Sequence, residues 1–331
     1  MAARSVVVVE QNRNAGTRIA RVLAAAAGFV PSVCGSDPEA LKAELPSEPG
    51  LLGCDAADLP RVLPWLDLWP DLRLVVWSTR APAELVALAR NDPRIRSIVG
   101  WPSFGSTPRP FELGVIARRW MNEEALPPLA NLLPWGNHVR TWRPNTSAAR
   151  DGVVAEVGSL LNGVGVGPRT AAKASDVAHE LLMNAMYVAP IDGRGEPKYA
   201  RDRRGEVTLT PREVPTLRLA FDGQILVLEA QDPFGRLADH QVLDGVLRGF
   251  ANHDAGTVEL DVGRGGAGLG MAMVYASSVA LMIEVRPGET TRVLWFHDVE
   301  IAPRDYRALP ASLHLFRAGA ASADGAGGWP S

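Results

Sequence analysis

Short, uniformly apolar segments alternate with longer amphipathic ones over residues 1–121. Residues 6–9 read Val-Val-Val-Val and residues 74–77 read Leu-Val-Val-Trp, without the polar alternation of a strand that faces solvent on one side. Strands that are apolar on both faces are typical of parallel sheets covered by helices on both sides. The amphipathic stretches between them, such as residues 17–28, predict those helices. We therefore expect residues 1–121 to form an α/β domain with a parallel sheet.

The pattern changes after residue 121. Residues 122–147 carry four prolines among leucine and tryptophan, so we expect an irregular connection there. Residues 148–303 begin with two helical segments and continue with strands and two further helices, which predicts a two-layer α+β sandwich. Residues 304–331 end in the run AGAASADGAGGWPS, whose small side chains bury little surface, so we expect a C-terminal tail that is mostly disordered.

The bulk composition excludes several classes of protein. The 331 residues carry 34 basic and 37 acidic side chains, and a net charge of −3 gives no basic field for nucleic acid or an anionic membrane. The longest apolar runs fall short of the ~18 residues that a membrane span needs. The two cysteines, Cys34 and Cys54, have no metal-ligand spacing and suit a reducing compartment. We expect two globular units in a soluble, cytoplasmic protein that binds neither nucleic acid nor membranes.

A polar stripe marks the helix predicted over residues 171–189. Residues at spacings of three and four share one face of a helix, and here they are Lys173, Asp176, Glu180, Asn184 and Tyr187. Glu180 and Asn184 should therefore point the same way. The exposed face of an ordinary amphipathic helix gives the same pattern, so the stripe gains weight only together with other segments.

Two later segments hold residues of a nucleotide-binding type. The apolar strand at residues 225–230 runs into Asp232, which could accept a hydrogen bond from an exocyclic amine, although an Asp-Pro turn is also common without a ligand. Residues 263–270 read GRGGAGLG and open a helix, and such a loop lets backbone amides approach phosphate oxygens. This loop stands near the end of its domain, which disfavours the Rossmann type of dinucleotide site.

In this order, the segments HELLMNAMYVAP, LEAQDPFGRL and GRGGAGLGMAMVYASS resemble the N box and the two glycine boxes of the GHKL superfamily. ATP-binding domains of this superfamily serve histidine kinases, anti-sigma-factor kinases, Hsp90 and type II topoisomerases. The segment around Thr291 resembles the closing Gly-Thr hairpin. The resemblance spans about half of the chain and implies that residues 148–303 form a GHKL-type α+β sandwich with ATP and Mg²⁺ as cofactors.

The resemblance also implies a role for each matching residue. Asn184 would ligate a Mg²⁺ that bridges the phosphates, and Glu180 would act as the base or orient the attacking group. Asp232 would read the adenine amino group, and Thr291 would support that end of the pocket. The glycine boxes add five further nucleotide-binding positions: Gly235, Gly266, Gly268, Leu269 and Gly270.

The first glycine box departs from the family pattern. Phe234 and Arg236 stand two and four residues after Asp232, where glycines are usual. Phe234 could reshape the adenine pocket. Arg236 could reach a phosphate or a partner carboxylate, or could be an exposed arginine of a turn.

The predicted order of elements in the first domain resembles a flavodoxin-like receiver of response regulators. Asp55 ends the third predicted strand, at the place of the phosphoacceptor. Receivers hold Mg²⁺ with an acidic pair and neutralise the phosphoryl group with a lysine that precedes a proline. Here Glu10 and Gln11 replace the pair, and either Trp101 or Arg109 replaces the lysine. We expect a degenerate pseudo-receiver, with phosphorylation of Asp55 disfavoured.

Several functions follow from these resemblances. The first is an ATP- and Mg²⁺-binding signalling protein, and its more specific form is a protein kinase of the anti-sigma-factor type in which Glu180 activates the acceptor hydroxyl. The alternatives are a non-catalytic interaction protein controlled by nucleotide in a two-component-like pathway, and an atypical histidine kinase. The last is disfavoured because His138 lies in a non-helical segment and His179 lies within the N box. A protein partner is expected through the receiver-like domain, and a homodimer is possible.

Overall fold

The computed structural model describes residues 4–79, 82–101, 109–133, 138–200, 205–254, 267–302, 305–306 and 309–317. In the N-terminal half, five strands pair in parallel, as the uniformly apolar segments predict for residues 6–9 and 74–77, whereas the partly exposed strand at residues 32–35 was not predicted. They are β1 (Ser5–Val9), β2 (Ser32–Gly35), β3 (Pro49–Asp55), β4 (Arg73–Ser78) and β5 (Ile95–Gly100). The helices of this half are α1 (Arg13–Ala26), α2 (Pro38–Ala43), α3 (Leu59–Leu68), α4 (Pro82–Asn91) and α5 (Pro110–Met121), with the 3-10 turn η1 (Ala56–Asp58).

The C-terminal half is mainly antiparallel. Its strands are β6 (Arg140–Trp142), β7 (Thr216–Phe221), β8 (Ile225–Asp232), β9 (Ala280–Arg286) and β10 (Thr290–Asp298). Its helices are α6 (Ser147–Gly163), α7 (Pro168–Met183), α8 (Asp239–Asp254) and α9 (Ala267–Ala276), with the π-helical turn η3 (Asn184–Val188) directly after α7. Before β6, the described part of the connection holds one 3-10 turn, η2 (Leu129–Asn131).

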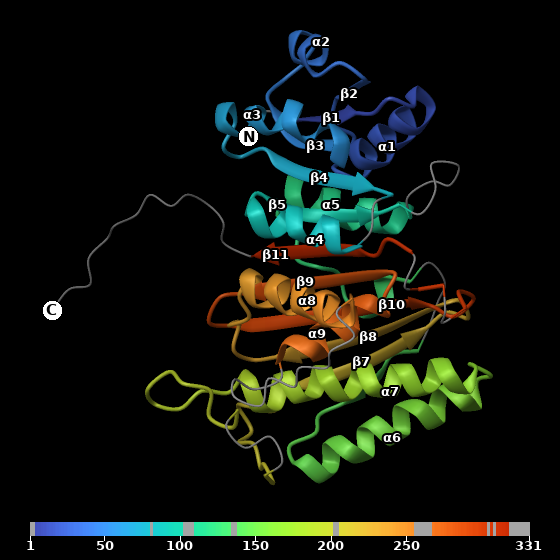
Figure 1. Cartoon of the computed structure of the whole chain (residues 1–331), viewed down its shortest axis with the longest axis vertical. Helices are drawn as coiled ribbons and strands as arrows, with labels where there is room; N and C mark the ends of the chain where they lie inside the picture. The colour runs from blue at the N-terminus through green and yellow to red at the C-terminus, as the bar shows by residue number, and fades with distance from the viewer. Residues whose placement is uncertain are drawn as a thin grey trace, which may run out of the picture.

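A final strand, β11 (Ser312–Arg317), joins the two halves into one sheet. It pairs antiparallel with β5 and parallel with β9. The described strands therefore form a single mixed sheet of eleven, in the order β2-β1-β3-β4-β5-β11-β9-β10-β8-β7-β6. In Figure 1 these strands lie one below the next, with β11 between the blue-to-teal N-terminal half and the rest. The α/β class expected from the sequence is confirmed, and the sheet is mixed.

The expectation of a C-terminal tail from residue 304 is wrong for the residues of β11. The strand is buried on both faces, but Ser312 and His314 interrupt its apolar pattern and conceal it in the sequence. Both side chains are tolerated in the interior because groups on the N-terminal half satisfy them. The Ser312 hydroxyl accepts a hydrogen bond from the Gly100 amide at 2.9 Å, and His314 Nε2 lies 2.8 Å from Glu112 Oε1. The small-residue run, residues 318–331, lies outside the described residues.

A buried charged cluster attaches β11 to α5. The fully buried Glu112 receives hydrogen bonds from Arg109 Nε at 2.9 Å and from His314. Burial alone would raise the pKa of Glu112, but Arg109 and His314 outweigh it, and the pKa falls to about 2. Arg109 also donates to the Val279 carbonyl at 2.8 Å and to Ser312 Oγ at 3.2 Å. One arginine of the N-terminal half thus contacts β11 and the start of β9.

Two hydrophobic cores run along the sheet, one on each face. Helices α1 and α5 cover one face together with the connection, whose Leu126, Leu129, Leu132 and Leu133 are buried. Helices α3, α4 and α6 to α9 cover the other face. Each core contains residues from both halves, so the two halves do not have the separate cores that the chain length suggested. None of the helices in these described segments is long and apolar enough to cross a lipid bilayer.

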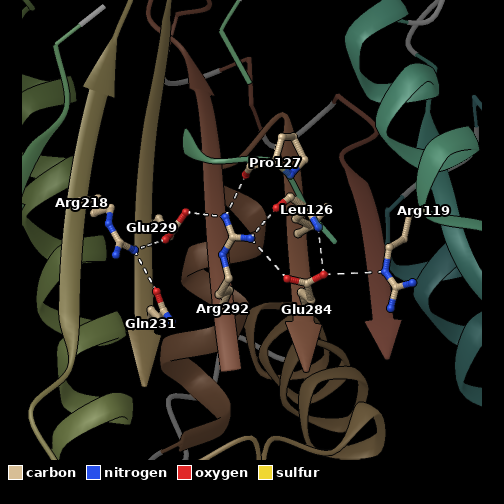
Figure 2. A network of polar contacts seen from close by, with 8 residues as sticks. All are labelled: Arg119, Leu126, Pro127, Arg218, Glu229, Gln231, Glu284 and Arg292. Atoms are coloured by element: carbon tan, nitrogen blue, oxygen red, sulfur yellow. Dashed lines mark hydrogen bonds and ion pairs between the residues drawn. The ribbon is translucent and has the colours of Figure 1, made fainter. Parts of the chain in front are cut away.

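The proline-rich connection is fixed to the sheet by a buried ionic network (Figure 2). Arg292 on β10 donates to Glu229 at 2.9 Å and to Glu284 at 3.3 Å, and both carboxylates are 2% exposed. The same guanidinium donates to the carbonyls of Leu126 at 2.8 Å and Pro127 at 3.1 Å. The Leu126 amide in turn donates to Glu284 at 3.0 Å. The connection expected over residues 122–147 is not irregular throughout, because its described part contains η2 and β6. Its backbone at Leu126 and Pro127 is held against the sheet.

The same network reaches α5 and β7. Arg119 of α5 lies 3.7 Å from Glu284, and Arg218 of β7 donates to Glu229 and, at 3.0 Å, to Gln231 (Figure 2). Removing one partner of such a buried set would leave an uncompensated charge at a cost of several kcal/mol. This side of the sheet is therefore held together by charges as well as apolar contacts.

We predict that Gly100→Ala destabilises the protein by about 1–3 kcal/mol, because a Cβ at this position would stand 2.2 Å from the Pro310 carbonyl oxygen, at the entry to β11. Urea unfolding measures the change. The matched control is Gly114→Ala inside α5, where the nearest atom is 3.9 Å away and the substitution should stabilise by up to about 1 kcal/mol. Equal unfolding midpoints for Gly100→Ala and the wild type would contradict the described packing of β11.

Candidate functional site

A cavity of about 350 Å³ opens on the helical side of the C-terminal half. Its lining includes Asn184 at the end of α7, Asp232 at the end of β8 and Thr291 on β10. These residues come from three segments that are far apart in the chain, and the sequence motifs predict that all three belong to one nucleotide pocket. The volume is within the range of small-molecule sites in proteins. The structure thus brings these three side chains to one hollow.

The strand register explains how Asp232 and Thr291 come to share the cavity. The two residues are direct partners across the β8–β10 ladder. Side chains alternate between the faces of a strand, so Ala230 and Asp232 face the cavity. Glu229 and Gln231 of the same strand belong to the ionic network on the opposite face. One strand therefore carries both the candidate site and the network behind it.

Asp232 is a buried carboxylate without a cationic partner among the described residues. Its side chain is 9% exposed, and its Oδ1 accepts the Phe234 amide at 2.9 Å. Burial raises the pKa of Asp232 to about 6, against a lowering by the Phe234 and Gly235 amides and by the amide and hydroxyl of the nearby Thr291. Beside it, the buried Thr291 hydroxyl has no hydrogen-bond partner of acceptable geometry in the described part of the chain. A buried hydroxyl without a partner is costly, and a ligand or an ordered water can satisfy it.

The helix that carries Glu180 and Asn184 changes its geometry at Asn184. Residues 168–183 are α-helical, and the π-helical turn begins at Asn184. A π turn holds an extra residue, so side chains after it are rotated away from the earlier stripe. Tyr187, expected on that stripe, is instead 1% exposed and bonds Ser147 at 3.0 Å. The stripe therefore ends at Asn184.

Glu180 does not line the cavity itself, but its carboxylate contacts the first turns of α9. A Cβ on Gly270 would stand 2.1 Å from Glu180 Oε2, so any larger residue at this position would displace the carboxylate. A carboxylate near a helix N-terminus is stabilised by the helix dipole. The helix of the predicted N box and the helix that follows the glycine loop are thus in direct contact.

The other predicted glycine-box residues have separate positions. Gly235 has a φ of 61°, and a Cβ there would stand 1.9 Å from the Arg286 carbonyl oxygen, so close packing against the β9–β10 hairpin explains this glycine. It is absent from the cavity lining. Gly268 and Leu269 belong to the first turn of α9. Gly266 lies outside the described residues.

One wall of the cavity was missed in the sequence analysis. Helix α8 contributes His240, Gln241, Val242, Asp244 and Arg248 to the lining. Positions 240, 244 and 248 repeat every four residues, so a polar helical stripe was a signal that could have indicated this wall. Arg236 also lines the cavity, and its guanidinium donates to the Gly195 carbonyl at 3.0 Å.

In the N-terminal half, the residues at the receiver-like positions are engaged by neighbours. Glu10 is buried and accepts hydrogen bonds from Trp77 Nε1 at 2.8 Å and from the Asn12 amide at 2.9 Å. Asp55 caps the turn η1 by accepting the Ala57 amide at 2.7 Å. The indole of Trp77 thus uses one oxygen of Glu10, the residue that stands at the position of the acidic pair of receivers.

Comparison with known proteins identifies no family. No protein-family profile matches the chain, and no curated protein matches it. Among solved structures, the chain is similar to the crystal structure of the SiaB–SiaC complex from Pseudomonas aeruginosa, with a TM-score of 0.32 and 16% sequence identity. The match covers 48% of this chain and 88% of that chain. A likeness of this degree carries no functional argument.

We predict that Asp232→Asn stabilises the nucleotide-free protein at pH 8. The folded state raises the pKa of Asp232 from 3.8 to about 6, so the carboxylate contributes stability only while it is protonated, and this contribution is lost as the pH rises from 4 through 6. Two pKa units correspond to at most about 3 kcal/mol, so we expect a gain of about 1–3 kcal/mol at pH 8 that disappears near pH 4.

Urea unfolding of wild type and variant at both pH values measures this difference. Asp67→Asn, at a side chain that is 75% exposed, controls for the loss of one negative charge. If Asp232→Asn is instead less stable than the wild type at pH 8, the ionised carboxylate stabilises the fold, and the prediction that its burial destabilises the free protein is wrong.

Proposed function

We propose that the cavity binds ATP together with Mg²⁺, and that the protein is a nucleotide-binding signalling protein of the GHKL type. The observation that supports this most is the meeting of Asn184, Asp232 and Thr291 at one cavity. These residues come from the segments that resemble the N box, the first glycine box and the closing hairpin, in the order that the superfamily uses. Because no family profile supports the assignment, it depends on this geometry and on the motifs.

The adenine end of the proposed site is formed by Asp232 and Thr291. With a pKa of about 6, Asp232 is mostly ionised at pH 7 and can accept a hydrogen bond from the exocyclic amine of adenine. The Thr291 hydroxyl lacks a partner among the described residues and can bond a ring nitrogen or a water that bridges to it. Adenine would therefore give each of the two side chains an additional hydrogen bond.

The phosphate end is formed by Asn184, Glu180 and α9. The amide oxygen of Asn184 suits Mg²⁺, which usually takes few protein ligands and completes its shell with water and phosphate. Bound there, the ion would neutralise phosphate charge. The first turns of α9 offer backbone amides and a partial positive charge, and Gly270 lets them approach Glu180 closely. Glu180 would then accept the proton of an attacking hydroxyl.

Transfer of phosphate to a protein is the more specific form of the proposal. Glu180 supports a kinase of the anti-sigma-factor type, because a proton acceptor stands beside the phosphate end. A second candidate is a non-catalytic interaction protein in which nucleotide controls a docking surface. The packing of α8, a wall of the cavity, against α4 of the N-terminal half favours this candidate. In both cases the N-terminal half would bind the protein partner.

We predict that Mg-ATP at ~100 times its dissociation constant stabilises the protein by ~2.7 kcal/mol, measurable as a rise in melting temperature. Asn184→Ala and Asp232→Asn should each abolish the rise, because one removes the metal ligand and the other the acceptor for adenine. Asn162→Ala, at an exposed position near the end of α6, is the control and should keep the full rise. A rise that persists in both cavity variants would refute the assigned pocket.

We predict that Glu180→Gln reduces phosphate transfer from γ-labelled ATP by ~100-fold or more and leaves the melting-temperature rise with Mg-ATP in place. Label on the protein and released phosphate are both counted. Asp176→Asn, one turn earlier on α7 and 63% exposed, should transfer as the wild type does. Binding without any transfer in the wild type would rule out the kinase and favour the nucleotide-controlled interaction protein.

A further inference from the structure

Helix α8 separates the cavity from the N-terminal half. On one side it lines the cavity, and on the other it packs against α4. Its N-terminal turn is also fixed to β11, because Arg317 donates to Asp239 at 2.7 Å and to the Leu237 carbonyl at 2.8 Å. The position of this wall therefore depends on contacts with the rest of the sheet and with α4.

Two oppositely charged residues of α8 face the cavity one turn apart. Asp244 and Arg248 both belong to the lining. Residues at this spacing on a helix are neighbours, and a carboxylate four positions before an arginine normally pairs with it. Here Asp244 is paired instead with Arg90 of α4. In the described part of the chain, Arg248 has neither an ion pair nor a side-chain hydrogen bond, and it is exposed at the cavity.

The other arginine of the lining is already in use. Arg236 donates to the Gly195 carbonyl at 3.0 Å. Arg248 is therefore the arginine of this lining that has no partner among the described residues, while Asp244 is a negative charge that Arg90 compensates. A cavity wall with a free guanidinium and a neutralised carboxylate is suited to an anionic ligand.

We propose that Arg248 binds the phosphate groups of the nucleotide, and that Arg90 keeps Arg248 available by holding Asp244. This rests on the proposed binding of ATP and adds a residue and a form of control to it. When Arg90 is absent, Asp244 attracts Arg248 and also repels the triphosphate. The N-terminal half thus sets the nucleotide affinity of the cavity through one ion pair.

The test is the affinity for Mg-ATP and for adenosine, measured by calorimetric titration at low ionic strength, where charge effects are least screened. Arg248→Gln weakens ATP binding by about tenfold or more, the size of a lost charge-assisted hydrogen bond, and leaves adenosine binding unchanged. Arg90→Gln weakens ATP binding by about three- to tenfold. The double variant Arg90→Gln/Asp244→Asn restores it to within about twofold of the wild type, because no carboxylate remains to compete.

The control is Arg96→Gln. Arg96 also reaches α8 from the N-terminal half, at 3.9 Å from Asp239, but Asp239 is absent from the cavity lining. This variant keeps the ATP affinity of the wild type. Melting temperatures verify that every variant is folded, which is expected because a half-exposed pair such as Arg90–Asp244 contributes about 1 kcal/mol or less.

The outcomes separate the two proposals. If the wild type binds no ATP, the proposed function fails and this inference with it. If the wild type binds ATP and Arg248→Gln binds it equally well, the inference is overturned while the proposed function stands. If Arg90→Gln weakens binding and the added Asp244→Asn does not restore it, the competition for Asp244 is disproved.

Discussion

The insertion of β11 between β5 and β9 is the constraint on which the rest of the structure depends. Without this strand, the parallel sheet of the N-terminal half and the antiparallel sheet of the C-terminal half would each end in an open edge. With it, both sheets become one, and the helices on each face share a continuous core. The same strand holds the start of α8 through Arg317, so it also fixes one wall of the candidate cavity.

The buried carboxylates are of two kinds: some are paired with cations of the protein, and Asp232 has no such partner among the described residues. Glu112 is surrounded by Arg109 and His314, and these partners lower its pKa to about 2. Glu229 and Glu284 share Arg292. These carboxylates stabilise contacts within the protein. They occur where α5, the connection and β11 meet the C-terminal half.

Asp232 is the exception among these acids. Its pKa rises to about 6 because burial removes water and no cation among the described residues replaces it. Strongly shifted pKa values of this kind cluster at functional sites. Together with the unpartnered Thr291 hydroxyl, it makes this end of the cavity the place where a ligand would contribute the most. Arg248 is the opposite case, because it is a cation of the cavity lining that has no partner in the described part of the chain.

The sequence by itself determined the local elements. The uniformly apolar runs predicted strands such as those at residues 6–9 and 74–77 but not the partly exposed β2. Asn184, Asp232 and Gly270 could be selected because short motifs combine spacing with chemistry.

Only the tertiary structure decided how these elements meet. No local pattern shows that Ser312 and His314 can lie inside a sheet, because the groups that satisfy them are about 200 residues earlier in the chain. The pairing of Asp244 with Arg90 rather than with its helical neighbour Arg248 is hidden for the same reason. Periodicity reports which face of an element is buried, whereas the partners of a buried or shared charge are set by contacts between distant segments.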